Sequence, residues 1–460
     1  MLSKVHAADA LACALRTGGD FAEIFYQDKL AETMSLQDGK IENVLTQRIH
    51  GAGIRVFRGL NCVYVHSCDT SPAGLKSAAM RAADAIGAIS CEREILLAEK
   101  PIANLHPVEI MPMDVSGRRK AALLKEACGA AAAVSPSIAH IRANLSCSRS
   151  EIQIFNSDGL AVADNRVYTR MGISAVASDG TQNQTGFEGP GAMMGFEFYE
   201  KRIDPADKGR SAARTALTML NAGPCPAGRM PVVMDGGFGG VVFHEACGHS
   251  LEATSVAFGK SEFCGKLGQQ IANERVTAID DGTIPNEWGS TNIDDEGAET
   301  TKLVLIENGI LKNYMVDKLN GRRMEMPSTG SGRRQDYNFA PTSRMHNTYI
   351  APGTDDENAM IAEIDYGLYA KKMGGGSVNP ATGEFNFAVV EGYMIRSGRI
   401  AEPVRGATLI GKGAELLMKI DRVGPRMWMA QGVCGSVSGS VPTNVGQPRI
   451  RISEITVGGR

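Results

Sequence analysis

Residues 231–258, PVVMDGGFGGVVFHEACGHSLEATSVAF, decide the character of this chain. The stretch begins as a short apolar run typical of a buried strand, continues as a glycine-rich turn and ends in a helical pattern. The helical part contains His244, Glu245 and His249. A zinc-peptidase helix normally carries H-E-x-x-H, with histidines four positions apart. Here they are five apart, so this is either a metal site with one additional residue or a pair of unrelated histidines.

The additional residue changes the geometry of the site. A regular α-helix turns by about 100° per residue, so His249 would lie roughly 140° away from His244. Both rings can face one ion only if a π-bulge absorbs the residue or if the helix ends at Gly248. Glycine favours either solution, because it adopts most backbone angles without steric cost. The glycine-rich run 236–240 is expected to let a substrate backbone pass close to the helix start.

A third ligand is needed, because catalytic zinc normally keeps three protein ligands and one water. Cys247 lies inside the motif, but a helical position two residues before His249 points away from it, so we expect a packing role. Cys434 is the stronger candidate. Gly432 and Gly435 flank it, which suits a thiolate on a tight loop. The alternative for Cys434 is an ordinary small buried side chain.

A rival group of ligands lies in NCVYVHSC, residues 61–68. On a strand, Cys62, Tyr64, His66 and Cys68 share one face, and neighbouring positions on that face are about 7 Å apart. No carboxylate stands among them. We therefore interpret this segment as ordinary strand packing.

Composition excludes several classes of function. A length of 460 residues implies two or three domains. The net charge of −3 gives no electrostatic reason to expect nucleic acid or an anionic membrane as partner. We expect neither a secretion signal nor a membrane span, since no window holds about 18 consecutive apolar residues. Ten cysteines without a C-x-x-C pair indicate free thiols and a cytoplasmic location.

Local signals predict an α+β protein with hairpins in both halves. The dipeptides Asp38-Gly39, Asp158-Gly159, Asn308-Gly309 and Ser397-Gly398 separate strand-like runs. Helical patterns cover 71–89, 116–135 with Ser116 as N-cap, and 206–223 ending at Gly223.

The domain boundary is expected in GPCPAGRMP, residues 223–231, because its proline and glycine break any regular element. We expect an N-terminal α/β domain with antiparallel hairpins over residues 1–222, with a division into two subdomains near 101–115 left open. A β-rich catalytic domain over 223–460 would carry the motif helix and the Cys434 loop.

Longer stretches carry a resemblance to a known family. They are HEACGHSLEA, GRRQDYNFAPTSRMHNTYIAPG, YGLYAKKMGGGSVNPATGEFNFAVVEGYMI, PVRGATLIG and GVCG with VPTNVGQPRIRISEITVGG; GGDFAEIFYQD and GAGIRVFRG add weaker support. Over nearly its whole length the chain resembles the TldD/PmbA family of metallopeptidases, on the TldD-type, catalytic side. The resemblance implies that His244, His249 and Cys434 bind Zn²⁺ and that Glu245 is the general base.

The resemblance also implies a mode of action. Unfolded or extended peptides would enter a cavity enclosed by an oligomer and lie there as an added strand. The oligomer would be a heterodimer with a PmbA-like second subunit, or a homodimer. Glu245 would take a proton from zinc-bound water, which then attacks the peptide bond. Two other functions stay open: a noncatalytic peptide-binding or assembly subunit with a structural metal, and a zinc hydrolase of non-peptide amides.

Substrate contacts are expected from two further segments. Arg344, His346 and Tyr349 offer hydrogen-bond donors for a tetrahedral oxyanion. His346 stands where the resemblance leads us to expect a smaller residue. Gly375, in the run 374–376, is expected to open backbone space in a substrate cleft.

Overall fold

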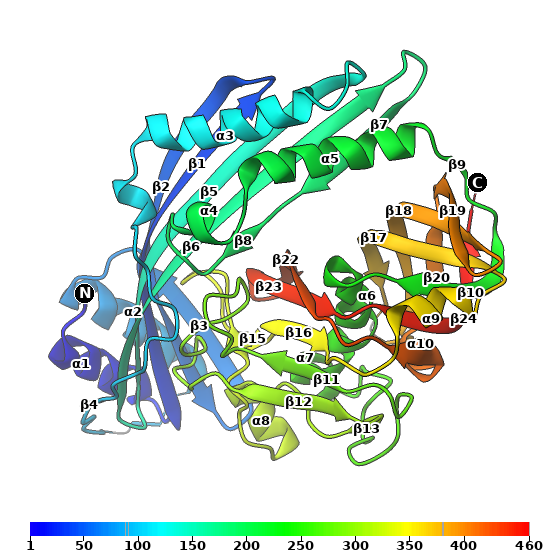
Figure 1. Ribbon diagram of the computed structural model, residues 1–460. Helices are drawn as coiled ribbons and strands as arrows, with labels where there is room; N and C mark the ends of the chain where they lie inside the picture. The colour runs from blue at the N-terminus through cyan, green and yellow to red at the C-terminus, as the bar shows by residue number, and fades with distance from the viewer. Residues whose placement is uncertain (88, 91, 380, 460) are drawn as a thin grey trace.

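The computed structural model describes residues 1–87, 89–90, 92–379 and 381–459, and it confirms the α+β class. Long curved strands form one part of the molecule, and smaller sheets pack beneath them (Figure 1). Within the described ranges, no helix is both long and apolar enough to cross a membrane.

The N-terminal part is built on one sheet with the antiparallel core β3-β2-β1-β5-β6, to which β4 adds a short parallel pair with β6. Its strands are β1 (Phe21–Gln37), β2 (Lys40–Arg58), β3 (Asn61–Ser67), β4 (Ala98–Glu99), β5 (Ile138–Asn156), β6 (Leu160–Ser178), β7 (Asn183–Glu188) and β8 (Gly191–Ala192). Its helices are α1 (Lys4–Leu15), α2 (Pro72–Ile86), the 3₁₀ turn η1 (Pro112–Asp114), α3 (Gly117–Ala132), α4 (Phe198–Lys201) and α5 (Pro205–Leu220).

One face of this sheet is covered by helices along its whole length. On β1, Ala22 and Ile24 pack in the cluster with α1 and α2, while Met34 and Leu36 pack in the cluster with α3 and α5. All four positions have the same parity, and alternate residues of a strand point to one face. The opposite, inner face therefore carries Glu23, Phe25 and their neighbours, and the rest of the chain packs against it.

The C-terminal part contains two larger sheets and a small two-stranded one. The first sheet has β9 (Gly223–Pro224), β10 (Gly228–Met234), β17 (Tyr366–Val378), β18 (Glu384–Arg396), β19 (Arg399–Arg405), β20 (Thr408–Lys412), β21 (Ile420–Val423) and β24 (Ile450–Gly458). The second has the order β13-β12-β11-β16-β23-β22, and its strands are β11 (Ala278–Asp281), β12 (Lys302–Glu307), β13 (Ile310–Leu311), β16 (Asn347–Ile350), β22 (Trp428–Ser436) and β23 (Gly439–Gln447). The third pairs β14 (Gly332–Arg333) with β15 (Thr342–Ser343).

Short helices connect these sheets and carry the motif. They are η2 (Gly237–Gly240), α6 (Val241–Phe243), η3 (His244–Gly248), η4 (His249–Leu251), α7 (Ala253–Val256), α8 (Lys318–Met324), α9 (Glu357–Ala362) and α10 (Gly413–Lys419). The motif segment packs into the largest apolar cluster, which draws on both larger sheets. The site is therefore supported by rigid elements on several sides.

Buried ion pairs join the two parts of the molecule. Arg55 on β2 donates to Glu23 at 2.8 Å and to Glu296 at 2.6 Å, and Arg334 donates to Glu23 at 2.6 Å. All four side chains are buried. Removing one partner would leave an uncompensated buried charge, which is strongly destabilising. The network thus fixes the inner face of the long sheet against the C-terminal part.

Most local predictions are confirmed, and the ends of the three predicted helices are corrected. Asp38 and Gly39 both have positive φ, 48° and 75°, as a type I′ hairpin turn requires. Ser116 caps α3 through its side chain. Helices α2, α3 and α5, however, end at Ile86, Ala132 and Leu220, about three residues earlier than predicted. At the end of α5, the side chain of Asn221 donates to the carbonyl of Leu217 and so caps the last turn.

Candidate metal centre

The motif helix absorbs its additional residue in a π-helical turn. Residues His244–Gly248 form this turn, and the backbone N–H of His249 donates to the carbonyl of His244. An i→i+5 bond places residues five apart on nearly the same side of the axis. The two imidazole centroids are consequently 5.0 Å apart, with their planes at 81°. Of the two geometric solutions, the bulge is the one observed, and the helix does not end at Gly248.

The glycines of the motif serve packing, which corrects their expected role. Gly248 has ordinary helical angles, φ −55° and ψ −53°. A Cβ there would lie 2.4 Å from the sulfur of Met345. Upstream, Cβ atoms at Gly236 and Gly240 would meet Trp428 and the backbone of Gly446 within 2.5 Å. The run 236–240 therefore brings the helix start against β22 and β23, and protein atoms fill the space expected for a substrate backbone.

Cys434 lies in a strand, not on a tight loop. It is part of β22, where it pairs with Val441 on β23 close to the hairpin turn. The flanking glycines continue the strand. A strand holds its side chains in fixed alternation, so this arrangement orients the thiol more rigidly than a loop would.

The three predicted ligands converge. The Sγ of Cys434 lies 3.3 Å from Nε2 of His244 and 3.2 Å from Nε2 of His249. Tetrahedral zinc with Zn–S about 2.3 Å and Zn–N about 2.0 Å would place these atoms about 3.5 Å apart. Throughout the described residues, this is the one group of three or more His, Cys, Asp or Glu side chains with ligand atoms this close, all within 4.8 Å. The donor set therefore fits a zinc-sized ion.

The electrostatics of the group favour a thiolate. Burial alone raises the pKa of the Cys434 thiol, but hydrogen bonds from His244 and His249 reverse this and lower it to about 4. Burial alone lowers the pKa of His249, whereas Glu252 and Cys434 raise it well above its usual value. Cys247, by contrast, is fully buried and burial raises its pKa, in keeping with the expected packing role.

The open side of the group is formed by Glu245 and His249. His244 and Cys434 are only 3% and 8% exposed, whereas the side chains of Glu245 and His249 are 29% and 15% exposed. The Oε2 of Glu245 lies 3.7 Å from Nε2 of His249. A carboxylate thus stands beside the ligand atoms on the side that solvent and substrate can reach.

Glu252 is a site residue that the sequence reasoning missed. Its Oε2 accepts from Nδ1 of His249 at 3.1 Å, and the side chain is buried. Metal-binding histidines commonly donate their second ring nitrogen to such a carboxylate, which fixes ring orientation and tautomer. The spacing His249 to Glu252, three residues, is a signal that could have identified it.

Arg344 supports the site from behind. It is fully buried and donates to the carbonyl of Cys434 at 2.5 Å, and to Ser438 and Gly439 at 3.0 and 2.8 Å. Its Nε lies 4.0 Å from Oε1 of Glu252. Its donors hold the β22–β23 hairpin instead of pointing to solvent, so the structure gives it a supporting place rather than the expected oxyanion contact.

The other expected substrate contacts are not members of the group of three ligands. His346 is buried and bonds to Asp280 at 3.2 Å. Tyr349 is buried on β16, where burial and nearby Asp281 raise its pKa to about 12. Gly375 lies in an exposed part of β17 with open space around it. Of the rival ligands, Cys62, Tyr64 and His66 lie in the ordinary strand β3, in which Tyr64 donates to the carbonyl of Tyr337, and Cys68 follows the end of that strand.

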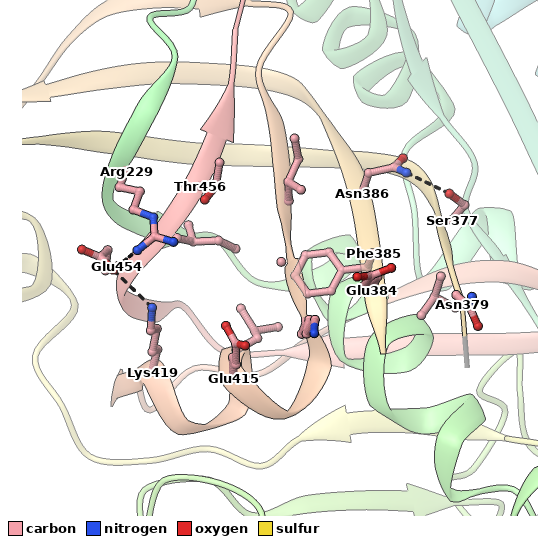
Figure 2. A pocket seen from close by; sticks show the side chains of 16 residues that line it. Arg229, Ser377, Asn379, Glu384, Phe385, Asn386, Glu415, Lys419, Glu454 and Thr456 are labelled. Carbon is pink, nitrogen blue, oxygen red and sulfur yellow. Dashed lines mark hydrogen bonds and ion pairs between the residues drawn. The ribbon is translucent and has the colours of Figure 1, made fainter. Parts of the chain in front are cut away.

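A surface groove of about 710 Å³ lies behind the motif and contains none of the three ligands. Figure 2 shows Arg229 and Lys419 directed at Glu454, at 3.7 and 3.2 Å. Gly413, at the start of α10, packs against the carbonyl of Ala246. This groove is therefore separated from the ligand atoms by the motif helix itself.

Comparisons with known proteins agree with this geometry. Family models match three consecutive segments: PmbA/TldA metallopeptidase domain 1 at residues 22–86, the central domain at 112–220 and the C-terminal domain at 227–459. The metalloprotease TldD homolog of Haemophilus influenzae is 36% identical over 452 residues, covering 96% of this chain and 93% of the relative. That of Buchnera aphidicola is 35% identical over 454 residues, with the same coverage.

A solved structure from Thermotoga maritima, described as a putative modulator of a DNA gyrase, superposes with a TM-score of 0.81. It covers 99% of this chain and all of its own, at 21% sequence identity. At that identity, the likeness shows the fold alone.

Proposed function

The chain belongs to the PmbA/TldD family of metallopeptidases, and on that basis we propose that it is a zinc-dependent peptidase. In this proposal His244, His249 and Cys434 hold the metal, and Glu245 is the general base. The observation that carries it is the convergence of these side chains from segments 190 positions apart. We keep the division into residues 1–222 and a catalytic part, 223–460, as part of the proposal.

Two imidazoles and a thiolate are ligands that suit zinc better than magnesium or calcium. A zinc ion held there would polarise the scissile carbonyl and lower the pKa of a water molecule. In this proposal Glu245 would accept the proton of the attacking water and pass it to the leaving amine. Its partial exposure lets it meet both water and substrate.

The site resembles a catalytic centre more than a structural one. Structural zinc is normally closed by four protein ligands. Across the described chain, the group has three, and its remaining side is bordered by Glu245. This supports an enzyme over the noncatalytic subunit that the sequence left open.

We propose extended or unfolded peptides as substrates. The support is the position of Cys434 in β22, the outermost strand of its sheet. An extended peptide can pair with an outer strand through its main chain, which selects for unfolded segments more than for particular side chains.

We also propose an oligomer, either with a PmbA-like second subunit or with a second copy. The support is the first half of β2, where Ile41, Val44 and Leu45 are exposed. Strand β3 pairs only with β2 residues from Ala52 onward, so this part of β2 has a free edge. Exposed apolar edge strands are typical of surfaces that other chains cover. A cytoplasmic location is proposed because every cysteine that the structure describes is free.

The test compares wild type, Glu245→Gln and the control Glu274→Gln, an exposed glutamate outside the site, each loaded with zinc. We expect Glu245→Gln to cleave an unstructured peptide about 10²–10⁴-fold more slowly with unchanged metal content. Equal rates for all three proteins would overturn the proposal. Turnover of small amides without any peptide cleavage would favour the amide hydrolase instead.

A further inference from the structure

A cavity of about 190 Å³ lies between the inner face of the long sheet and the C-terminal part. Lys29 on β1 lines one wall, and Arg333 on β14 lines another. Val441, also in the lining, is the ladder partner of Cys434. Trp288 lines the cavity too and donates to the carbonyl of Gly432, two residues before Cys434. The cavity therefore adjoins the strand that carries the thiol.

Four cationic side chains line the cavity, and two of them are neutralised. Arg166 pairs with Asp164 at 3.0 Å and with Asp295 at 2.7 Å. Arg334 pairs with Glu23 at 2.6 Å. Arg334 belongs to the buried network that joins the parts of the molecule, and Asp295 links Arg166 to it by also accepting from the backbone N–H of Arg334 at 2.7 Å. The other two cations, Lys29 and Arg333, have no such partners among the residues that the structure describes.

Arg333 is a buried guanidinium without an acid. It is 3% exposed, and its Nη1 donates to the carbonyl of Met345 at 2.5 Å. In the described part of the chain, no carboxylate lies within 4.0 Å of its nitrogens. Burial lowers its pKa and the neighbouring Arg166 and Arg344 act in the same direction, whereas Tyr168 and Asp295 act to raise it. Arginine nevertheless stays charged, and a buried charge is costly unless it is paired.

Lys29 faces the same space from the long sheet. Among the described residues its amine has neither a hydrogen-bond nor an ion-pair partner, and Asp336 acts on it only at longer range. Burial lowers its pKa. On the adjacent strand β5, Ser146 and Ser148 add hydroxyl donors to the lining. Asp295 also lines the cavity but pairs with Arg166, so among the described residues the cavity keeps two cations without an ion-pair partner and presents hydrogen-bond donors from two sides.

We propose that this cavity binds a carboxylate of the substrate peptide, held between Lys29 and Arg333, and that the peptide's C-terminal carboxylate is the group that enters. This rests on the proposed peptidase function and names the class of peptide end that the site takes. The volume corresponds to about six water molecules, which is enough for a carboxylate and its nearest atoms.

The position of the cavity sets where cleavage occurs. Paired residues such as Cys434 and Val441 are about 5 Å apart, and an extended peptide advances about 3.3 Å per residue. A carboxylate anchored in the cavity therefore leaves only a few residues before the scissile bond. The enzyme should therefore release short C-terminal fragments of its peptide substrate.

Binding is tested with the zinc-loaded Glu245→Gln variant, which removes the proposed general base. The probe is an alanine hexapeptide with an N-terminal fluorophore, read by fluorescence anisotropy. It is used in three forms: a free C-terminal carboxylate, a C-terminal amide, and an amide with glutamate as last residue. We expect the free carboxylate to bind about 10- to 100-fold more tightly than the plain amide, because a charge-assisted pair is lost.

In the second arm, the substitutions Lys29→Met, Arg333→Gln and Arg333→Lys are introduced one at a time into the Glu245→Gln variant. Lys29→Met and Arg333→Gln should abolish most of the preference for carboxylate, and Arg333→Lys should keep part of it. The matched control is Lys40→Met, an exposed lysine on β2, which should leave the preference unchanged. Hydrogen exchange on each variant shows whether it is folded, and Lys29→Met tests the proposal even if the Arg333 variants are not.

Each outcome bears on the proposal. Equal binding of carboxylate and plain amide, or a preference that survives Lys29→Met, overturns it. If the amide with terminal glutamate binds as tightly as the free carboxylate, the cavity takes side-chain carboxylates, and the assignment to the C-terminus is wrong. If only the peptidase proposal is wrong, wild type cleaves no peptide, but the Glu245→Gln variant still binds the free carboxylate more tightly than the plain amide.

Discussion

Met345 lies directly beneath the π-helical turn, and Gly248 leaves the room for it. A Cβ at position 248 would lie 2.4 Å from the Met345 sulfur, far below normal van der Waals contact. The residue is glycine for reasons of volume, since its backbone angles are open to any amino acid. The spacing of the two imidazoles therefore depends on a close contact between two segments that are distant in the sequence.

Replacing Gly248 with alanine should push the turn away from Met345. We expect a loss of about 1–3 kcal/mol in the free energy of unfolding, because overpacking forces backbone shifts. Gly248→Ala should also lower the metal affinity, because the displaced turn carries the two imidazoles. The double variant Gly248→Ala/Met345→Ala should recover part of that affinity. Gly375→Ala is the control, since its added methyl meets open space. Denaturant titration and metal titration check both effects; equal behaviour of the two glycine variants would contradict this account.

Glu252 orients His249 through its Nδ1. We expect Glu252→Ala to weaken zinc binding about 10- to 100-fold, since loss of such a partner frees the ring. Glu252→Gln keeps a hydrogen-bond acceptor and should lose less. Chelator competition measures the affinities, with Glu274→Gln as control. Unchanged affinity in Glu252→Ala would show that the carboxylate has no part in positioning the ligand.

At the scale of elements, the β22–β23 hairpin delivers the thiol, and Arg344 holds that hairpin through three hydrogen bonds. Arg344→Met should loosen it, so that the amides of residues 433–440 exchange with solvent about tenfold faster or more. Arg399→Met, at an exposed position on β19, is the control. Unchanged exchange in this segment would mean that strand pairing alone positions Cys434.

The segment between α2 and α3 is attached to the C-terminal part through His106. Its Nδ1 accepts from the backbone of Asn286 at 2.9 Å, and burial lowers its pKa from 6.5 to about 4. Between pH 6.5 and about pH 4, His106 is therefore protonated in the unfolded chain but neutral in the folded protein. Stability from this group is complete above about pH 6.5 and is lost as pH falls towards 4.

Wild type should accordingly lose about 2 kcal/mol of unfolding free energy between pH 7 and pH 5 from this one group. His106→Gln should show a smaller loss over the same interval, whatever its stability at pH 7. His140→Gln, at an exposed position on β5, should keep the full loss. Denaturant melts at the two pH values measure this. A His106→Gln protein as acid-sensitive as wild type would refute the assignment.

At the scale of the whole molecule, local features were predictable and contacts between distant segments were not. Asp38-Gly39 and Ser116 act within a few residues, so the sequence alone identifies the hairpin and the helix cap. The motif histidines and Cys434 were identified by residue type, spacing and family resemblance. The strand that holds Cys434, by contrast, depends on β23, and its flanking glycines wrongly suggested a loop.

The buried charges show even more clearly that contacts between distant segments cannot be predicted from local sequence. Glu23, Arg55, Glu296 and Arg334 come from distant segments, and no local pattern pairs them. Arg344 was predicted to contact substrate because it offers hydrogen-bond donors from the same segment as His346 and Tyr349. It is buried because it bonds to Cys434, Ser438 and Gly439, at least 90 positions away in the sequence, and only the folded chain brings these segments together.

The central claim is that one metal ion is bound jointly by His244, His249 and Cys434. Titration of the metal-free protein with Co²⁺ tests it most directly, because thiolate ligation adds a charge-transfer band in the near ultraviolet to the cobalt spectrum. We predict that this band saturates at one ion per chain in wild type and in Cys62→Ser, and that it is absent in Cys434→Ser. A band of equal intensity in Cys434→Ser, or none in wild type, would contradict the account.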